Sequence, residues 1–286
     1  MKNIVIAAGY ATRLGELTRN FPKPLLKIGE RSILGRMLDD IDRIPDIDEH
    51  IIVTNHKFAP IFEEWKQKEG RWQKPITIID DGTETNETRL GAVCDLLLAI
   101  DYLSNSQWSN SKSSNSQLSN GQSSNSKLSN GQLSNSKSSN SKLSNSKSSS
   151  LLVVAADNLL FFSFQEFIDF AKEKGTSCIM CHEQPSIEKL QRTGVVEVDD
   201  NWKVLGMEEK PQHPKTHWAV PPFYIYMEHD LDLVRHSVEN GCGKDAPGNL
   251  AHYMVEHTTM HAWPMSAGRF DIGSLDTYHE AIEKYG

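Results

Sequence analysis

Short apolar runs alternate with longer amphipathic stretches through the first half of the chain and beyond it. The runs cover residues 4–8, 50–54, 76–80 and 151–156, and they are rich in Ile, Val, Leu and Ala. Runs of this length are typical of strands that are covered on both faces, as in a parallel sheet. Because helical patterns separate them, the sequence predicts βαβ units and an α/β fold with a doubly wound, mainly parallel sheet.

Two of the intervening segments carry the spacing of an amphipathic helix. Ser32 stands where an N-cap is favoured, just before a segment whose apolar stripe is formed by Ile33, Leu34, Met37, Leu38 and Ile41. Residues 90–103 present a wider apolar face, formed by Leu90, Val93, Cys94, Leu97, Leu98 and Ile100. Both segments are therefore expected to pack as helices against the sheet.

A low-complexity tract interrupts this pattern. From Ser104 to Ser148 the sequence repeats Ser-Asn-(Ser/Gly)-(Gln/Lys)-x, and only some units carry a large apolar residue. Such polar repeats bury too little apolar surface to offset chain entropy, so disorder is expected and a small β-solenoid is disfavoured. We therefore expect one domain built from residues 1–103 and 151–286, with residues 104–150 inserted in a helix-to-strand connection, away from the strand ends that bind ligands.

Composition excludes several classes of protein. The 286 residues are 38% hydrophobic and carry a net charge of −8, so the chain is not expected to bind nucleic acid, because no basic cluster offsets the acidic balance. No stretch approaches the ~20 apolar residues of a membrane span, and the N-terminal run is too short for a signal peptide. The sequence favours a cytoplasmic protein with no membrane partner and leaves a homo-oligomer open.

The cysteines and histidines give no sign of a metal centre. Cys178 and Cys181 lie in one apolar run, where a strand sends them to opposite faces, and no second pair completes a zinc site. We expect them in the core of the sheet. Isolated histidines such as His50 and His182 are expected to be surface residues or hydrogen-bonded core residues.

The loop after the first apolar run has the features of an anion site. Gly9 lets the chain turn without a side chain in the way, and Arg13 follows on the same loop. Converging backbone amides and a guanidinium favour phosphate groups. Lys23 lies a short distance on, within Pro22-Lys23-Pro24-Leu25-Leu26. The combination indicates nucleotide chemistry.

Two aspartates occupy positions suited to a metal that accompanies phosphate. Asp157-Asn158 follows the apolar run 151–156, so this carboxylate emerges at a strand carboxyl end. Asp271 precedes Gly273 and a helix-capping Ser274 far along the chain. Mg²⁺ bound to nucleotide phosphates is commonly held by one or two carboxylates, so the pair predicts an Mg²⁺ site.

These motifs together resemble the sugar nucleotidyltransferases, and in particular the glucose-1-phosphate thymidylyltransferases. The N-terminal stretch Ile6-Ala7-Ala8-Gly9-Tyr10-Ala11-Thr12-Arg13-Leu14 and the Pro-Lys-Pro resemble the signature of that family. Residues 193–199, 207–211 and 218–226 resemble its sugar-binding half and occur in the same order. The resemblance covers nearly all of the chain except the repeat, and it implies a Rossmann-like nucleotidyltransferase fold.

The resemblance also implies a reaction and a set of roles. A sugar 1-phosphate attacks the α-phosphorus of a nucleoside triphosphate, pyrophosphate leaves, and no covalent enzyme intermediate is needed. Arg13 and Lys23 would be catalytic and Asp157 and Asp271 would hold Mg²⁺. The nucleotide would be bound by Ala8, Gly9, Thr12, Arg13 and Gly91, and the sugar phosphate by Asn158, Gly194, Glu209, Lys210 and Val220.

Departures from the family pattern limit what this implies about substrates. Ala11 stands where the family has a second loop glycine, Gly15-Glu16 replace a usual proline, and Pro221-Pro222 replace a small residue and a glycine beside the expected sugar. Residues 85–92 lack the family's glycine-rich turn, which leaves thymidine, uridine and cytidine nucleotides open. The favoured substrates are glucose 1-phosphate with dTTP or UTP. The alternatives are a cytidylyltransferase acting on an alcohol phosphate such as phosphocholine, and a non-catalytic nucleotide-binding relative.

Overall fold

The chain forms a large sheet with helices on both faces. The computed structural model describes residues 1–70, 72–115 and 150–286, with no account of side chains at 106–115. The strands are β1 (Lys2–Ile6), β2 (Lys27–Ile28), β3 (Arg31–Ser32), β4 (Glu49–Thr54), β5 (Ile76–Asp80), β6 (Leu151–Ala155), β7 (Asn158–Leu160), β8 (Ser177–Glu183), β9 (Gly194–Val198), β10 (Val204–Glu209), β11 (Trp218–Val220), β12 (Phe223–Tyr226), β13 (Met260–Pro264) and β14 (Arg269–Asp271).

The α-helices are α1 (Glu16–Arg19), α2 (Ile33–Ile41), α3 (Ala59–Glu69), α4 (Ala92–Asn115), α5 (Phe164–Lys174), α6 (Ile187–Leu190), α7 (Asp232–Glu239), α8 (Pro247–His257) and α9 (Leu275–Tyr285). Short 3₁₀ helices cover Thr12–Leu14, Lys23–Leu25 and Glu228–Asp230. None of the described helices has the length and apolar character needed to cross a membrane.

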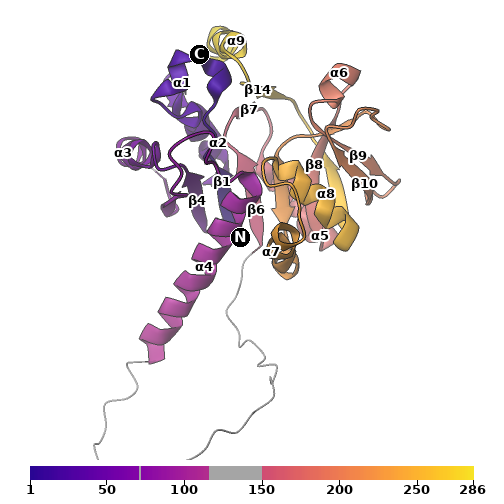
Figure 1. The fold of residues 1–286 in the computed structure, drawn as a ribbon, viewed down its shortest axis with the longest axis horizontal. Coiled ribbons are helices and arrows are strands. Elements are labelled where there is room, and N and C mark those ends of the chain that lie inside the picture. Colours follow the sequence, from indigo (N-terminus) through magenta and orange to yellow (C-terminus); the bar gives the residue numbers. More distant parts are fainter. Residues whose placement is uncertain (71, 116–149) are drawn as a thin grey trace, which may run out of the picture. The chain divides into compact units, whose positions relative to one another are not determined.

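Ten strands form one mixed sheet in the order β10-β9-β11-β8-β12-β6-β1-β4-β5, with β13 paired to β8. The four strands predicted from the apolar runs, β6, β1, β4 and β5, pair in parallel and confirm the βαβ pattern. In the other half, β9 to β12 pair antiparallel with their neighbours. Figure 1 shows these two halves side by side, with β1 and β6 near the middle.

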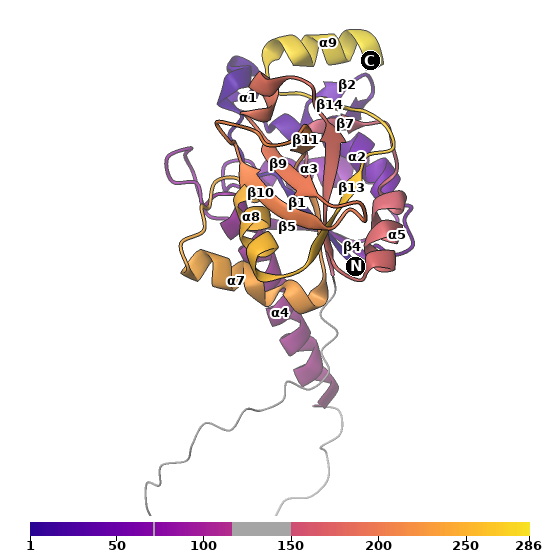
Figure 2. The ribbon, with the colours of Figure 1, turned by 90° about the vertical axis from the view of Figure 1, so that its right-hand side faces the viewer.

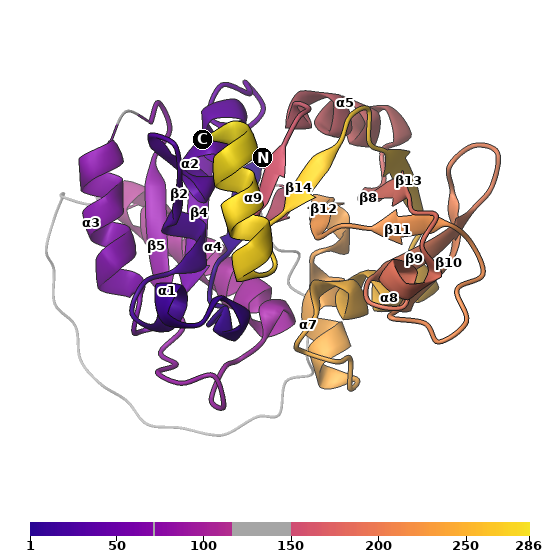
Figure 3. The same ribbon diagram turned by 90° about the horizontal axis from the view of Figure 1, so that it is seen from above.

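Strand alternation assigns the helices to opposite faces of the sheet. Val5, Leu152 and Cys178 join one apolar cluster with buried residues of α2, α3 and α5. Their neighbours in sequence, such as Ile4 and Val153, are buried on the other face. In the view from above, α5 lies on one side of the sheet and α7 and α8 on the other (Figure 3). The prediction of a doubly wound α/β fold is confirmed, and Cys178 and Cys181 are core residues of β8 as predicted.

Helix α4 differs from its prediction. It begins at Ala92 instead of residue 90 and runs to Asn115, beyond the expected end at residue 103. Its buried apolar positions are Val93, Leu96 and Ala99, whereas Leu90 is 39% exposed. The predicted stripe shares Val93 with this buried face, but its Leu97, Leu98 and Ile100 are only half-buried. Residues 116–149 of the repeat lie outside the described residues, and their predicted disorder stays a prediction.

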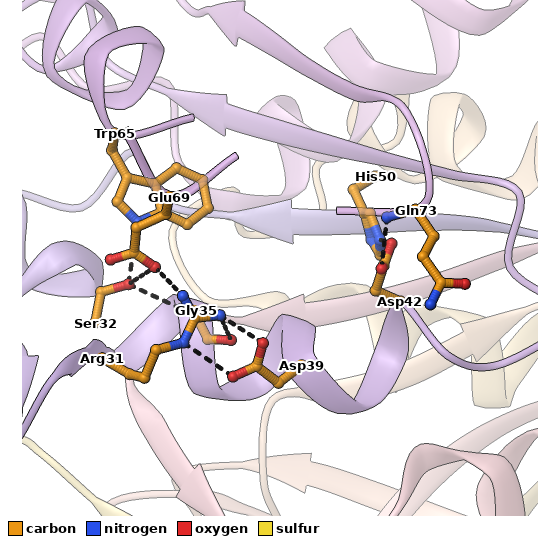
Figure 4. A network of polar contacts seen from close by, with 9 residues as sticks. All are labelled: Arg31, Ser32, Gly35, Asp39, Asp42, His50, Trp65, Glu69 and Gln73. Carbon is orange, nitrogen blue, oxygen red and sulfur yellow. Dashed lines mark hydrogen bonds and ion pairs between the residues drawn. The ribbon is translucent and has the colours of Figure 1, made fainter. Parts of the chain in front are cut away.

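Arg31 joins α2 to α3 through a network of charged hydrogen bonds (Figure 4). Its guanidinium donates to Glu69 Oε2 at 2.7 Å and to both carboxylate oxygens of Asp39. Ser32 accepts from the Gly35 backbone N–H at 3.0 Å and from the Trp65 indole at 3.1 Å. The predicted N-cap is therefore confirmed, and one serine also fixes the position of α3.

A second network buries His50 in β4 against Asp42 (Figure 4). The Nε2 of His50 lies 3.1 Å from Asp42, which also accepts from the backbone N–H groups of Gln73 and Lys74. Asn3 donates to the Nδ1 of His50. Burial lowers the pKa of His50, although Asp42 opposes this effect. Burial would raise the pKa of Asp42, but the N–H donors around it outweigh burial and lower it.

These shifts predict that acid destabilises the fold through His50. The unfolded chain takes up a proton near the ordinary pKa of 6.5 that the buried imidazole refuses, so stability is lost as pH falls below that value. Each tenfold difference in proton affinity between the two states is worth about 1.4 kcal/mol. Asp42 adds a further loss of stability only when the pH falls below 3.8, the ordinary pKa of its carboxyl group.

Urea unfolding between pH 7 and pH 4.5 measures this effect. The free energy of unfolding should fall more steeply in the wild type than in His50→Gln, which cannot take up the proton. His213→Gln, at an exposed site, is the matched control and should keep the wild-type slope. Equal slopes in all three proteins would contradict the assignment.

Candidate active site

The loop after β1 is held from behind by hydrogen bonds to the segments that follow β4 and β5. Asn55 donates to the Ala8 carbonyl at 3.0 Å, and the Tyr10 hydroxyl donates to the Thr83 carbonyl at 3.1 Å. A Cβ placed on Gly9 would meet no described atom within 4 Å. Thr12 and Arg13 are exposed on the same loop. The loop is thus fixed on one side and open on the other.

Ala11 adopts a backbone conformation that suits glycine. Its φ of 48° and ψ of 41° place it in the left-handed region, where a Cβ crowds the following carbonyl. The hydrogen bonds that its carbonyl accepts from Leu14 N–H and the Thr18 hydroxyl hold it there. Ala11, which stands where the family has a glycine, therefore adopts a conformation that suits glycine at a local steric cost.

Lys23 brings the N-terminal segment to the second half of the chain. Pro22 and Pro24 flank it, and its side chain is almost fully buried. The Nζ atom lies 3.0 Å from Oδ2 of Asp157, which follows β6. The ion pair joins residues that are 134 positions apart in sequence. It unites two motifs that the sequence analysis assigned to the nucleotide and to the metal.

The ribbon of β7 and β14 places the second aspartate beside the first. Asp271 pairs with Asn158 in its register, and Ile272 N–H donates to the Asp157 carbonyl at 3.1 Å. Ser274 then caps α9 in a capping box with Thr277, as the sequence predicted for this serine. Figure 2 shows β7, β14 and α9 together at one end of the sheet, opposite the N-terminus.

The two carboxylates repel one another. Desolvation is the main cause that raises the pKa of Asp271, and the negative charge of Asp157 raises it further. The positive charges of Arg269, Lys23 and Arg13 lower it but do not cancel the rise. No group of three or more His, Cys, Asp or Glu side chains suited to a metal occurs in the described part of the chain. Two carboxylates alone suit an Mg²⁺ that takes its other ligands from water and phosphate oxygens.

The residues predicted to bind the sugar phosphate meet across three strands. Gly194 of β9 pairs with Glu209 of β10 on one side and with Val220 of β11 on the other. Burial raises the pKa of Glu209, whose carboxylate lies 3.7 Å from the Lys210 ammonium. Lys210 has a positive φ of 52°, a strained conformation of the kind found at functional sites. Asn158 lies apart from this group, in the β7–β14 ribbon.

Glycines make the space that Glu209 occupies. A Cβ on Gly194 would lie 3.2 Å from Oε2 of Glu209, and a Cβ on Gly248 of α8 would lie only 1.9 Å from the same atom. Gly91 also has a structural requirement, because its φ is +91° and a Cβ there would lie 2.5 Å from the Lys244 carbonyl oxygen. Gly248 was missed in the sequence, where Pro247-Gly248-Asn249 reads only as a helix start.

The sequence analysis also missed Arg269. His182 is half-buried, and its Nδ1 is buried without a partner among the described residues, so this nitrogen lacks the hydrogen bond expected of a core histidine. Burial, and secondarily the Arg269 guanidinium, lower its pKa to about 4.

A separate hollow of about 440 Å³, lined by residues such as Leu205, Lys215 and Trp218, contains none of the predicted site residues.

The sequence matches the nucleotidyl transferase family over residues 2–286. The chain belongs to this family. A glucose-1-phosphate adenylyltransferase of Fervidobacterium nodosum is 22% identical over 98% of the chain, which spans 60% of that protein. A glucose-1-phosphate thymidylyltransferase of Neisseria gonorrhoeae is 30% identical over 32% of the chain and 32% of its own length.

A solved structure of UDP-glucose pyrophosphorylase with UDP-glucose shares the fold. Its TM-score is 0.72 at 16% identity, and the alignment covers 99% of this chain and 97% of that one. Membership of the nucleotidyl transferase family and the shared fold confirm the resemblance that the motifs indicated. The roles of the individual residues stay predictions.

We expect Ala11→Gly to stabilise the protein. The change removes about 1–2 kcal/mol of left-handed strain, offset by about 0.4–1 kcal/mol of added entropy in the unfolded chain, for a net gain on the order of 0.5–1 kcal/mol. Urea unfolding at pH 7 measures the difference. Ala281→Gly, inside α9 where the backbone is helical, is the control and should destabilise, because glycine is unfavourable in a helix interior. Destabilisation by both changes would refute strain at Ala11.

We expect Gly248→Ala to displace Glu209. The added methyl group would overlap Oε2, so the carboxylate must move. The KM for a sugar phosphate should then rise roughly 10- to 100-fold, as expected for loss of a hydrogen bond to a charged group worth about 1.5–3 kcal/mol. Gly268→Ala is the control, since its Cβ would meet only a Phe161 ring atom at 3.9 Å. An unchanged KM in a folded Gly248→Ala protein would show that Glu209 does not contact the sugar.

Proposed function

We propose that this protein is an enzyme that joins a nucleoside triphosphate to a sugar 1-phosphate, giving a nucleoside diphosphate sugar and pyrophosphate. The observation that carries the proposal is the Lys23–Asp157 ion pair at 3.0 Å. It joins the phosphate-type loop of the N-terminal half to the aspartates of the C-terminal half. Family membership over residues 2–286 supports the same conclusion.

The chain positions the nucleoside triphosphate and the sugar 1-phosphate, which repel each other, and neutralises the charge that develops as the bond between them forms. Arg13 and the loop amides from Ala8 to Thr12 bind the triphosphate, and Lys23 stabilises the charge on the α-phosphate. Lys210 binds the phosphate of the sugar, and Glu209 accepts hydrogen bonds from sugar hydroxyls. Because the attacking phosphate is already an anion, no protein base is needed.

Asp157 and Asp271 would hold Mg²⁺. The ion would neutralise phosphate charge when bound, and it would also relieve the repulsion that raises the pKa of Asp271. Asp157 is paired with Lys23 in this structure. Transfer of Lys23 to the triphosphate would release that carboxylate oxygen for a new positive partner.

The proposed substrates are glucose 1-phosphate with dTTP or UTP. The adenylyltransferase and thymidylyltransferase relatives both act on glucose 1-phosphate according to their names. A panel of nucleoside triphosphates and sugar phosphates, read by pyrophosphate release, tests the proposal. Phosphocholine with CTP tests the alcohol phosphate alternative in the same assay. If the folded protein with Mg²⁺ releases pyrophosphate with none of the substrate pairs, a non-catalytic nucleotide-binding protein is favoured.

We expect Lys23→Ala and Lys210→Ala to affect different kinetic constants. Lys23→Ala should lower kcat roughly 10²- to 10³-fold, as loss of one charge-stabilising donor does. Lys210→Ala should mainly raise the KM for the sugar phosphate, since its partner is already charged in the ground state. Steady-state kinetics with both substrates varied measure the two effects.

Lys27→Ala is the control for these variants, because Lys27 is exposed four positions after Lys23 and should leave kcat and KM unchanged. A defect of Lys210→Ala confined to the nucleotide would reverse its assignment. Near-normal kcat in Lys23→Ala would remove Lys23 from the catalytic residues.

A further inference from the structure

Arg269 is a deeply placed cation that no motif of the sequence accounts for. It begins β14, two residues before Asp271, so both side chains project from one face of that strand. Asp271 pairs with Asn158 in register, which puts Asn158 on the same face. Phe270 and Leu159 alternate with them and lie with the apolar cluster around Leu14, Ile28 and Ile272. The polar face of the ribbon therefore carries Arg269, Asp271 and Asn158 beside one apolar residue, Leu160, and the other face is apolar.

A continuous chain of hydrogen bonds runs along the polar face to Lys23. Arg269 Nη1 donates to Asn158 Oδ1, and Asn158 Nδ2 donates to Asp157 Oδ1 at 2.7 Å. The other oxygen of Asp157, Oδ2, accepts from Lys23 Nζ at 3.0 Å. Asn158 is 1% exposed, so bulk water does not compete for these hydrogen bonds.

The chemistry of Arg269 fixes the orientation of the Asn158 amide. A guanidinium only donates hydrogen bonds, and a carboxylate only accepts them. The carbonyl of Asn158 must therefore face Arg269 and its NH₂ group must face Asp157. The reverse amide orientation would set donor against donor and acceptor against acceptor. A neutral acceptor or a shorter side chain at position 269 would remove this constraint.

We propose that Arg269 is a positioning residue that acts through Asn158 to keep Oδ1 of Asp157 occupied and to leave Oδ2 for a positive partner. The partner in this structure is Lys23. The inference rests on the proposed function, in which Mg²⁺ would be held by the same carboxylate. The charge of Arg269 also counters the repulsion between Asp157 and Asp271.

A double-mutant cycle in the full chain tests whether Arg269 acts through Asn158. Arg269→Gln and Asn158→Ala should each raise the Mg²⁺ concentration for half-maximal rate roughly 10- to 100-fold, as loss of a residue supporting a metal ligand does. The double variant should be no worse than the more affected single variant, because both changes break one chain of contacts. Arg269→Lys should recover part of the loss.

The matched control is Arg36→Gln. Arg36 also donates to acceptors from distant segments, the Ile28 and Tyr285 carbonyls, but it touches none of the proposed site residues. This variant should lower the free energy of unfolding and leave the Mg²⁺ dependence unchanged. Independent, additive effects of Arg269→Gln and Asn158→Ala would overturn the proposal.

A second readout needs no catalytic activity. In protein labelled with ¹⁵N-asparagine, the side-chain NH₂ signal of Asn158, assigned by its loss in Asn158→Ala, should exchange slowly with solvent. It should exchange at least tenfold faster in Arg269→Gln, or in Arg269→Lys where Arg269→Gln does not fold. An unchanged signal in a folded variant would refute the positioning role. If the wild-type protein makes no nucleoside diphosphate sugar, the proposed function fails and this measurement still tests Arg269.

Discussion

The parallel register of β1 and β6 is the constraint on which the site depends. Ile6 pairs with Ala155, so both strands end at the same level of the sheet. The segments that follow them, with Lys23 on one and Asp157 on the other, therefore emerge at one edge and meet in an ion pair. A slip of one residue would turn the side chains of β6 to the opposite face of the sheet and would separate these charges.

Arg31 and His50 of the N-terminal half are held differently from Asp157 at the strand ends. Both lie between strands and helices and have hydrogen-bond partners on both sides from the protein itself. At the strand ends, one oxygen of Asp157 accepts from the buried Lys23 ammonium at 3.0 Å. The other oxygen accepts from the Asn158 amide at 2.7 Å. One carboxylate thus has a charged partner on one oxygen and a neutral partner on the other.

Close packing positions Glu209, the residue proposed to bind the sugar. Among the described residues its ion-pair partner is Lys210, and their separation of 3.7 Å is longer than a hydrogen bond. Its place is instead defined by two glycines, Gly194 and Gly248, that leave room for its carboxylate. The backbone of α8 approaches β10 closely at Gly248 for this reason. Close packing thus positions Glu209, whereas hydrogen bonding positions Asp157.

The sequence by itself determined the elements whose signals are local. The apolar runs predicted β1, β4, β5 and β6, and single serines predicted the caps at Ser32 and Ser274, because burial pattern and capping depend on residues a few positions apart. The order of the motifs was enough to indicate the family, and Lys23, Asp157 and Asp271 were singled out from their places after the first loop, after a strand and before a glycine turn. The buried face of α4 was only partly predicted, because apolar residues surround much of this helix.

Only the tertiary structure decided which groups meet. Arg269 looks like an ordinary charge at a strand start, and its role appears only when the β7–β14 register places it against Asn158. Gly248 looks like part of a helix start, and its necessity appears only when α8 packs against Glu209. The orphaned nitrogen of His182 likewise depends on what surrounds β8. Such features arise from contacts between segments far apart in sequence, which local pattern and propensity do not specify.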